Sequence, residues 1–158
     1  MDMKVLILYH SKTGHTLEAA TATADGIRSA GSEVDLVTAK KFNADMIANY
    51  DGLIVGSPCW AGSITGSGVA KPIAKAMKSL PANSLEIKRC GSISVFAAKG
   101  GSNTIRALGE LLSEKGCKDY KRGPTAKAGV PFSAWTGPAV TEEDEEDYKR
   151  YGSGFVAS

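Results

Sequence analysis

Short apolar runs alternate with helix-length segments along this chain, and that alternation limits the fold more than any other feature. The apolar runs predict buried strands at 5–9, 34–37, 53–55 and 93–98, followed by a more polar edge strand within 117–129. Parallel strands buried on both faces have continuous apolar runs, and they need long connections that helices supply. The pattern therefore predicts an α/β fold in three layers, with a five-stranded parallel sheet between helices. The length of 158 residues fits a single domain over 1–158.

Helical periodicity fills the segments between these runs. The spacing predicts helices over 16–30, 69–80 and 103–115, and a last helix that begins at Thr141. In the first helix, one apolar face is predicted from residues that recur every three or four positions: Leu17, Ala20, Ala24, Ile27 and Ala30. Thr141 and Asp144 have the spacing of a capping box. The aromatic residues that follow share one face, which we expect to dock on the body: Tyr148, Tyr151 and Phe155.

The formal net charge of +2 conceals an uneven distribution of charge. Six acidic residues are consecutive at 142–147, whereas residues 1–141 hold 17 basic and 11 acidic groups, a net charge of +6. We interpret the acidic run mainly as the first turns of a capped surface helix, where the helix dipole stabilises negative charge. The alternative is a dedicated binding patch. The basic body favours an anionic ligand or an acidic partner, but it is too mild to indicate nucleic acid.

Composition excludes several other classes of protein. Hydrophobic residues make up 42% of the chain and charged residues 23%, which excludes wholesale disorder. No apolar run approaches the roughly 20 residues of a membrane helix, and the start lacks the features of a signal sequence. Cys59, Cys90 and Cys117 include no Cys-x-x-Cys pair, and only His10 and His15 are present. We therefore expect a cytoplasmic protein without a disulfide framework or a metal site.

The segment between the first strand and the first helix reads Tyr-His-Ser-Lys-Thr-Gly-His-Thr over residues 9–16. Hydroxyls and a glycine at a helix N-terminus are typical of a loop that binds a phosphate with amide and hydroxyl donors. The segment lacks the spacing of a nucleotide-triphosphate loop and the glycines of a dinucleotide fingerprint. It favours a monophosphate, with a Ser/Thr-rich helix cap as the alternative. We expect the His15 amide to face the phosphate and the His15 ring to face solvent.

The pattern Tyr-x-Ser-x-Thr-Gly-x-Thr after a first strand resembles the FMN-phosphate loop of the flavodoxin family. The resemblance spans nearly the whole chain and implies a flavodoxin-like, doubly wound fold with strand order 2-1-3-4-5 and an FMN cofactor. It implies that the phosphate is held by Ser11, Lys12, Thr13, Gly14, His15 and Thr16. The loop that edges the flavin ring corresponds to Ser57, Pro58, Cys59, Trp60, Ala61 and Gly62. The loop along the pyrimidine side corresponds to Ala97, Ala98, Lys99, Gly100, Gly101 and Ser102.

The resemblance implies that Trp60 stacks on the flavin ring, because an indole beyond a buried strand suits a flat conjugated surface. The alternative is a hydrophobic plug folded onto the body. Cys59 is interpreted as a small residue lining the pocket, with a redox-active thiol as the alternative.

The third loop departs from the family pattern, since it has no second aromatic residue. One face of the flavin is therefore open to a nicotinamide or quinone, or is covered by another residue such as Tyr120 or Trp135. Lys99 near the ring would raise the flavin potential, whereas the alternative for Lys99 is a solvated surface charge.

Three functions follow from this interpretation. The first is an FMN-binding redox protein that shuttles electrons between partner proteins, with no catalytic side chain. The second is an NAD(P)H-dependent quinone or FMN oxidoreductase, because the pattern at 56–63 also resembles loops of flavodoxin-fold quinone reductases. The third is an interaction module without FMN.

The expected partners are redox proteins or a small-molecule acceptor rather than nucleic acid or membrane. We expect the protein to be a monomer or a small homo-oligomer. Many flavodoxins are acidic, whereas the body of this chain is basic. We therefore expect the surface with which this protein meets its partner to have the opposite charge from that of those flavodoxins.

Overall fold

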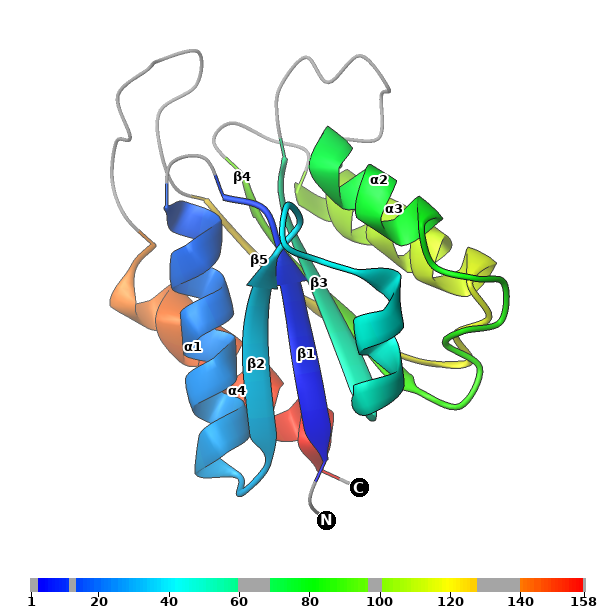
Figure 1. Cartoon of the computed structure of the whole chain (residues 1–158). Coiled ribbons are helices and arrows are strands. Elements are labelled where there is room, and N and C mark those ends of the chain that lie inside the picture. The colour runs from blue at the N-terminus through cyan, green and yellow to red at the C-terminus, as the bar shows by residue number, and fades with distance from the viewer. Residues whose placement is uncertain (1–2, 12–13, 60–68, 97–100, 128–139, 158) are drawn as a thin grey trace.

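A five-stranded parallel sheet forms the centre of the molecule (Figure 1). The structure, a computed structural model, describes residues 3–11, 14–59, 69–96, 101–127 and 140–157. The strands lie side by side in the order β2 (Glu33–Thr38), β1 (Lys4–Tyr9), β3 (Gly52–Cys59), β4 (Arg89–Phe96) and β5 (Asp119–Lys127). Every neighbouring pair is parallel. The predicted five-stranded sheet, its order 2-1-3-4-5 and the edge position of the last strand are confirmed.

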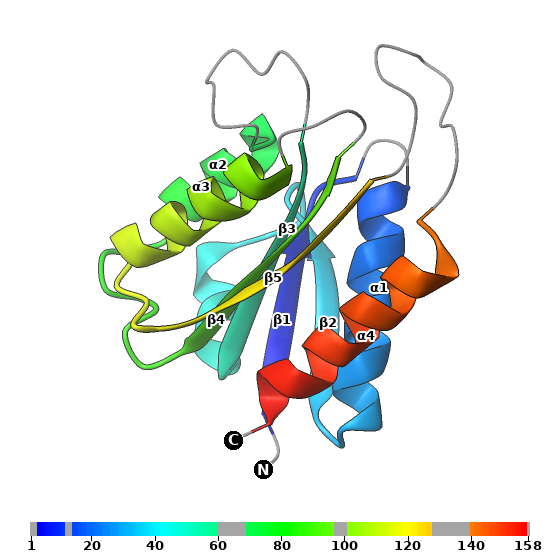
Figure 2. The same ribbon diagram turned by 180° about the vertical axis from the view of Figure 1, so that it is seen from behind.

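Helices cover both faces of the sheet, which gives the three layers that the sequence predicts. One face carries α1 (His15–Ser29) and α4 (Glu142–Val156), and the other carries α2 (Lys71–Lys78) and α3 (Gly101–Glu114) (Figures 1 and 2). A short 3-10 helix, η1 (Ala44–Asn49), was not expected. It begins where the Asn43 side chain accepts a hydrogen bond from the Asp45 amide at 2.9 Å.

Two of the predicted strand boundaries are wrong. Residues 56–59 were expected in a loop, but β3 continues through them to Cys59. Likewise β4 begins at Arg89, four residues before the predicted start. In both cases the two strands pair continuously from Gly52 with Arg89 to Cys59 with Phe96. Backbone pairing therefore extends each strand into residues whose side chains carry no apolar signal.

The hydrophobic core has two parts, one on each face of the sheet. Alternate residues of β1 serve opposite parts: Val5 and Ile7 pack toward α1 and α4, whereas Leu6 and Leu8 pack toward α2 and α3. All four are completely buried or nearly so. The alternation follows from the strand geometry, in which successive side chains point to opposite faces. A strand whose central residues are all apolar therefore holds both helical layers.

The buried side of α1 differs from the predicted apolar face. Leu17 is 40% exposed and Ala30 is also exposed, although both were expected in the core. Ala20, Ala24 and Ile27 are buried as expected, and the buried side also includes Ala19, Ala22 and Gly26. The reason is that α1 packs against α4 as well as against the sheet. Small residues face α4, and the buried stripe is correspondingly wider and rotated.

Two glycines allow this close approach of α1 and α4. A Cβ atom added to Gly26 would overlap the Lys149 carbonyl oxygen, and one added to Gly152 would overlap the Thr23 carbonyl oxygen. Each glycine therefore makes room for the backbone of the opposite helix. The helix pair is fixed from both sides at its crossing point.

The last helix is anchored to the sheet by the aromatic face that the sequence predicts. The Thr141 hydroxyl accepts a hydrogen bond from the Asp144 amide at 3.1 Å, which confirms the predicted cap. Tyr148 is completely buried, and its hydroxyl donates to the Ser94 carbonyl at 2.6 Å. The Tyr151 hydroxyl donates to the Lys121 carbonyl at 2.7 Å. Burial raises the pKa of both phenols, so both remain protonated donors at neutral pH.

The glycine contact predicts a sharp difference between two positions of α4. Replacing Gly152 by Ala should destabilise the protein by about 1–3 kcal/mol, because the methyl group forces α1 and α4 apart. Gly154→Ala is the matched control, since no atom lies within 4 Å of its added Cβ. The control should be neutral or stabilising by up to about 1 kcal/mol, because alanine favours helix over glycine. Urea unfolding curves measure both effects, and equal losses in the two variants would contradict this packing.

Candidate functional site

The carboxyl ends of β1, β3 and β4 meet at one edge of the sheet, which we call the ligand edge. Tyr9 pairs with Gly56, and Gly56 pairs with Ile93, so the three strands are level there. The two chain termini lie at the opposite end of the sheet (Figure 1). In open α/β sheets, ligands bind outside the carboxyl ends of the strands, where the strand order reverses. That reversal lies between β1 and β3 in this sheet.

The chain turns directly from β1 into α1 at this edge. The Ser11 hydroxyl accepts hydrogen bonds from the Gly14 amide at 3.0 Å and from the Leu17 amide at 3.4 Å. Gly14 is the N-cap residue, with a φ of 94° in the left-handed region that favours glycine. An added Cβ at Gly14 would meet no atom within 4 Å. The N-terminus of α1, with its positive dipole end, is therefore presented at the ligand edge beside open space.

Thr16 connects this turn to the neighbouring strands. Its side chain is buried, and its methyl carbon would lie 3.5 Å from a Cβ added to Gly56. The same added atom would lie 3.1 Å from the Ile93 side chain. Gly56 thus lets the first turn of α1 sit close to the ends of β3 and β4. The starts of the connections after β1, β3 and β4 are held together as a result.

Ser57 joins the two ends of the connection between β3 and α2. Its side chain is completely buried, and the hydroxyl accepts a hydrogen bond from the Ala70 amide at 2.9 Å. The same hydroxyl donates to the Pro58 carbonyl at 2.9 Å. Ala70 is the N-cap residue of α2. The hydroxyl therefore fixes where α2 begins relative to the ligand edge.

Several predicted site residues lie outside the described part of the chain. They are Lys12, Thr13, Trp60, Ala61, Gly62, Ala97, Ala98, Lys99 and Gly100, together with Trp135. Cys59 ends β3 and Gly101 begins α3, so both are placed at the ligand edge by their backbone. Ser102 follows in the first turn of α3. The contacts of these residues with a ligand stay predictions.

The expectation that the His15 ring faces solvent is wrong. His15 is only 7% exposed, and its Nδ1 lies 3.5 Å from the Glu18 carboxylate. The other Glu18 oxygen accepts a hydrogen bond from the Val140 amide at 3.0 Å. Val140 is buried and directly precedes the cap of α4. His15 and Glu18 therefore tie the first turn of α1 to the start of α4.

Sequence reasoning missed this role of Glu18. The available signal was local: a carboxylate three residues after a histidine at a helix start places both side chains on one helix face. The partner Val140 is 122 residues away along the chain. No local pattern specifies such a contact, so only the packing of α1 against α4 reveals it.

Tyr120 does not lie at the ligand edge, so it does not cover a flavin face. It pairs with Cys90 near the start of β4. At about 3.3 Å per residue, that position is roughly 20 Å from the end of β4 at Phe96. The Tyr120 hydroxyl lies 2.6 Å from the Ser92 hydroxyl, and its ring would contact a Cβ added to Gly109. Tyr120 instead packs α3 onto the sheet.

The shifted pKa values of Tyr50 and Cys90 are explained by how these residues are packed, away from the ligand edge. Burial, reinforced by a 2.7 Å hydrogen bond to Asp35, raises the pKa of Tyr50 to about 12. Burial also raises the pKa of the Cys90 thiol. Within the described ranges, no three His, Cys, Asp or Glu side chains are grouped to hold a metal ion. The described edge itself offers amides and hydroxyls, which suit the binding of an anion.

None of the helices in the described ranges is both long and apolar enough to span a membrane.

Comparison with known proteins gives the family. The flavodoxin family model matches residues 7–129. An NAD(P)H dehydrogenase (quinone) of Acidithiobacillus ferrooxidans is 38% identical over 166 residues, covering 84% of this chain and 82% of that protein. A second protein of the same description, from Chromohalobacter salexigens, is 28% identical and covers 90% of this chain and 77% of its own length. The chain belongs to the flavodoxin family.

Solved structures support the same fold at lower sequence identity. Oxidised flavodoxin 1 from Bacillus cereus superimposes with a TM-score of 0.72 at 21% identity, covering 97% of both chains. The two-electron reduced flavodoxin of Megasphaera elsdenii gives a TM-score of 0.75 at 18% identity, covering 96% of this chain and 97% of that one. These similarities extend over nearly the whole of each chain.

As a member of this family, the chain is an FMN-binding redox protein. The described part of the site fits the phosphate of such a cofactor. The positive end of α1, the left-handed Gly14 with open space beside it and the Ser11 hydroxyl lie together at the ligand edge, and these groups offer neutral hydrogen-bond donors. Such a turn suits a monophosphate held by backbone and hydroxyl hydrogen bonds.

The contact between Glu18 and Val140 predicts a local effect on stability. Glu18→Ala should lower the free energy of unfolding by about 1–2 kcal/mol, because it removes a charge-assisted hydrogen bond to a buried residue's amide. Asp25→Ala is the control on the same helix, since among the described residues the Asp25 side chain makes an exposed 3.6 Å pair with Arg28 and no other ion pair or hydrogen bond. The control should change stability by less than about 0.5 kcal/mol. Thermal unfolding measures both variants, and an equal loss in both would refute the anchoring role.

Proposed function

We propose that this protein carries electrons between partner proteins through an FMN whose phosphate binds at the N-terminus of α1. The observation that carries the proposal is the turn from Ser11 through Gly14 into α1 at the ligand edge. Ser11, Thr13 and Thr16, with the neighbouring amides, hold the phosphate. Trp60 stacks on the ring, and the remaining residues of 57–62 and 97–102 line its edges. Bound FMN supplies the redox chemistry, and the protein supplies binding, orientation and electrostatics.

The described residues contribute rigidity to this proposed site. Ser57 fixes the start of α2, and Thr16 packs the first turn of α1 beside Gly56. His15 and Glu18 hold α1 to the residue before α4. Each of these groups holds another part of the protein in place, in addition to any contact with the cofactor. Such an arrangement supports a protein whose residues position a cofactor and perform no acid–base step themselves.

A second candidate function is the NAD(P)H-dependent reduction of quinones. The observation that favours it is the name NAD(P)H dehydrogenase (quinone) shared by relatives at 38% and 28% identity. The absence of an aromatic residue at 97–99 adds to it, because an uncovered flavin face would admit a nicotinamide or quinone. The family assignment favours either function over a module without FMN. For both functions we propose a cytoplasmic protein that is a monomer or a small homo-oligomer.

Anaerobic mixing with NADH or NADPH separates the two functions. An electron carrier should keep its flavin absorbance for many minutes after mixing, because no group brings the nicotinamide to the ring. The same sample should bleach when a flavoprotein reductase is added, which shows that the flavin is reducible. If NADPH alone bleaches the flavin within seconds and the flavin absorbance recovers on addition of a quinone, the electron-carrier function is wrong and the quinone-reductase function is supported. A purified protein that neither contains nor takes up FMN would overturn both.

A further inference from the structure

The exposed side of α2 carries an uninterrupted positive charge. Lys71, Lys75 and Lys78 are all exposed, and their spacing of four and three residues places them on one side of the helix. The opposite side is buried through Ile73, Ala76 and Met77. The helix contains no acidic residue. We call the three lysines the α2 lysine face.

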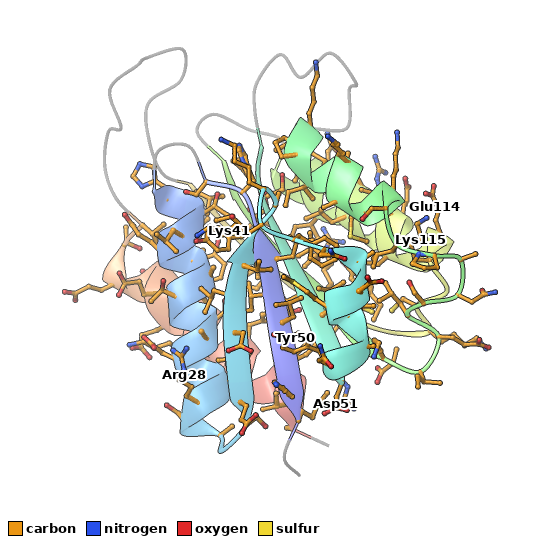
Figure 3. All side chains as sticks on the ribbon, in the orientation of Figure 1. Arg28, Lys41, Tyr50, Asp51, Glu114 and Lys115 are labelled. Atoms are coloured by element: carbon orange, nitrogen blue, oxygen red, sulfur yellow. The ribbon has the colours of Figure 1, made fainter. Side chains whose placement is uncertain are left out.

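The charge of this face is not neutralised by the ion pairs of the described chain. Those pairs involve Arg28, Arg89, Lys118, Lys149 and Arg150, in addition to His15, and none includes a residue of α2. A fourth ammonium group extends the face, because Lys115 donates a hydrogen bond to the Lys78 carbonyl at 3.4 Å. Figure 3 shows Lys115 beside Glu114 at the end of α3. The neighbouring α3 thus contributes charges of both signs, whereas α2 contributes only positive charge.

Negative charge is concentrated on the other side of the sheet. The acidic run opens α4. Three carboxylates and one ammonium group, from Glu18, Asp25, Glu145 and Lys149, line a shallow depression of about 350 Å³ between α1 and α4. Figures 1 and 2 show α2 and α4 on opposite faces of the sheet. The molecule is therefore polarised across the sheet. A partner would approach the two sides in different electric fields.

The α2 lysine face begins at the ligand edge. Ser57, near the end of β3, binds the amide of Ala70, and Lys71 is the next residue. With a rise of about 1.5 Å per residue, Lys75 and Lys78 lie about 6 and 10 Å further along the helix. That span is comparable with the Debye length of about 10 Å at 0.1 M salt, so the charges act on a partner together. The face adjoins the place where electrons enter and leave under the proposed function.

We propose that the α2 lysine face docks an acidic redox partner protein beside the flavin. The inference rests on the proposed function, and it specifies the sign of the partner surface. Complementary charge steers an encounter and fixes the orientation of the two proteins. A protein partner is favoured over nucleic acid because only one short helix is uniformly basic and the opposite side of the molecule is acidic. A nucleic-acid site needs a broader set of cations along the phosphate backbone.

The test compares two variants with the same loss of charge. The first is the triple variant K71Q/K75Q/K78Q. The control is R28Q/K118Q/R150Q, whose three side chains are exposed away from α2 and take part in surface ion pairs. Glutamine preserves helix propensity, and circular dichroism and flavin absorbance check that each variant folds and binds FMN. The probes are an acidic plant-type ferredoxin, basic cytochrome c and a 20-base-pair DNA duplex, titrated by calorimetry at low and high salt.

The expected result is that ferredoxin binds most tightly of the three probes and that salt weakens its binding. The α2 variant should weaken ferredoxin binding at low salt by at least about fivefold, whereas the control should change it by less than about twofold. If both variants weaken ferredoxin binding equally, the loss reflects only the change in net charge, and the proposal is overturned. Tighter binding of cytochrome c or of the DNA duplex would also overturn it.

Binding is measured without electron transfer, so failure of the electron-carrier function does not decide this result. The apoprotein is titrated in parallel with the holoprotein. If the protein proves unable to hold FMN, the proposed function fails, while the binding data on the apoprotein still decide whether the lysine face recognises an acidic protein.

Discussion

The hydrogen-bond register between β1, β3 and β4 is the constraint on which the rest of the structure depends. Tyr9, Gly56 and Ile93 lie at one level because the strands are parallel and in register. Parallel strands require helical crossovers, so each strand end is followed by a connection that leads into a helix. The carboxyl ends consequently collect three helix starts at one edge: those of α1, α2 and α3. A positive dipole end and neutral donors at the first of these starts make the edge suitable for a phosphate.

The elements around this edge are held by contacts that bridge distant parts of the chain. Ser57 positions α2, Gly56 admits Thr16, and Glu18 connects α1 to Val140. The paired glycines of α1 and α4 then keep those two helices at backbone contact. The same arrangement separates charge, because it places the acidic start of α4 and the lysines of α2 on opposite faces. The net charge of +2 therefore conceals a basic α2 on one face and the acidic start of α4 on the other.

The sequence predicts the parts of this fold that depend on local pattern. Continuous apolar runs locate the first four strands, the more polar stretch 117–129 contains the edge strand, and Thr141 with Asp144 locates the cap of α4. The errors arise where a distant partner decides. Pairing with β4 carries β3 through Gly56 to Cys59, although those residues have no apolar periodicity. Packing on α4 rotates the buried side of α1 and leaves Leu17 exposed, and the His15 ring is buried beside Glu18 rather than exposed to solvent. Tyr120 was one alternative for covering a flavin face on residue type alone, whereas its register with Cys90 places it at the other end of the sheet.

A titration of the apoprotein with FMN and with riboflavin tests the central claim most directly. The two ligands share the ring and differ in the terminal phosphate. The ratio of their dissociation constants therefore isolates the binding energy of the phosphate at the N-terminus of α1. The account predicts that the fluorescence of both flavins is quenched on binding. It also predicts that FMN binds at least about 100-fold more tightly than riboflavin, as expected for two or three charge-assisted hydrogen bonds. Equal affinity for the two ligands, or no binding of FMN, would contradict the assignment of this edge as the phosphate site.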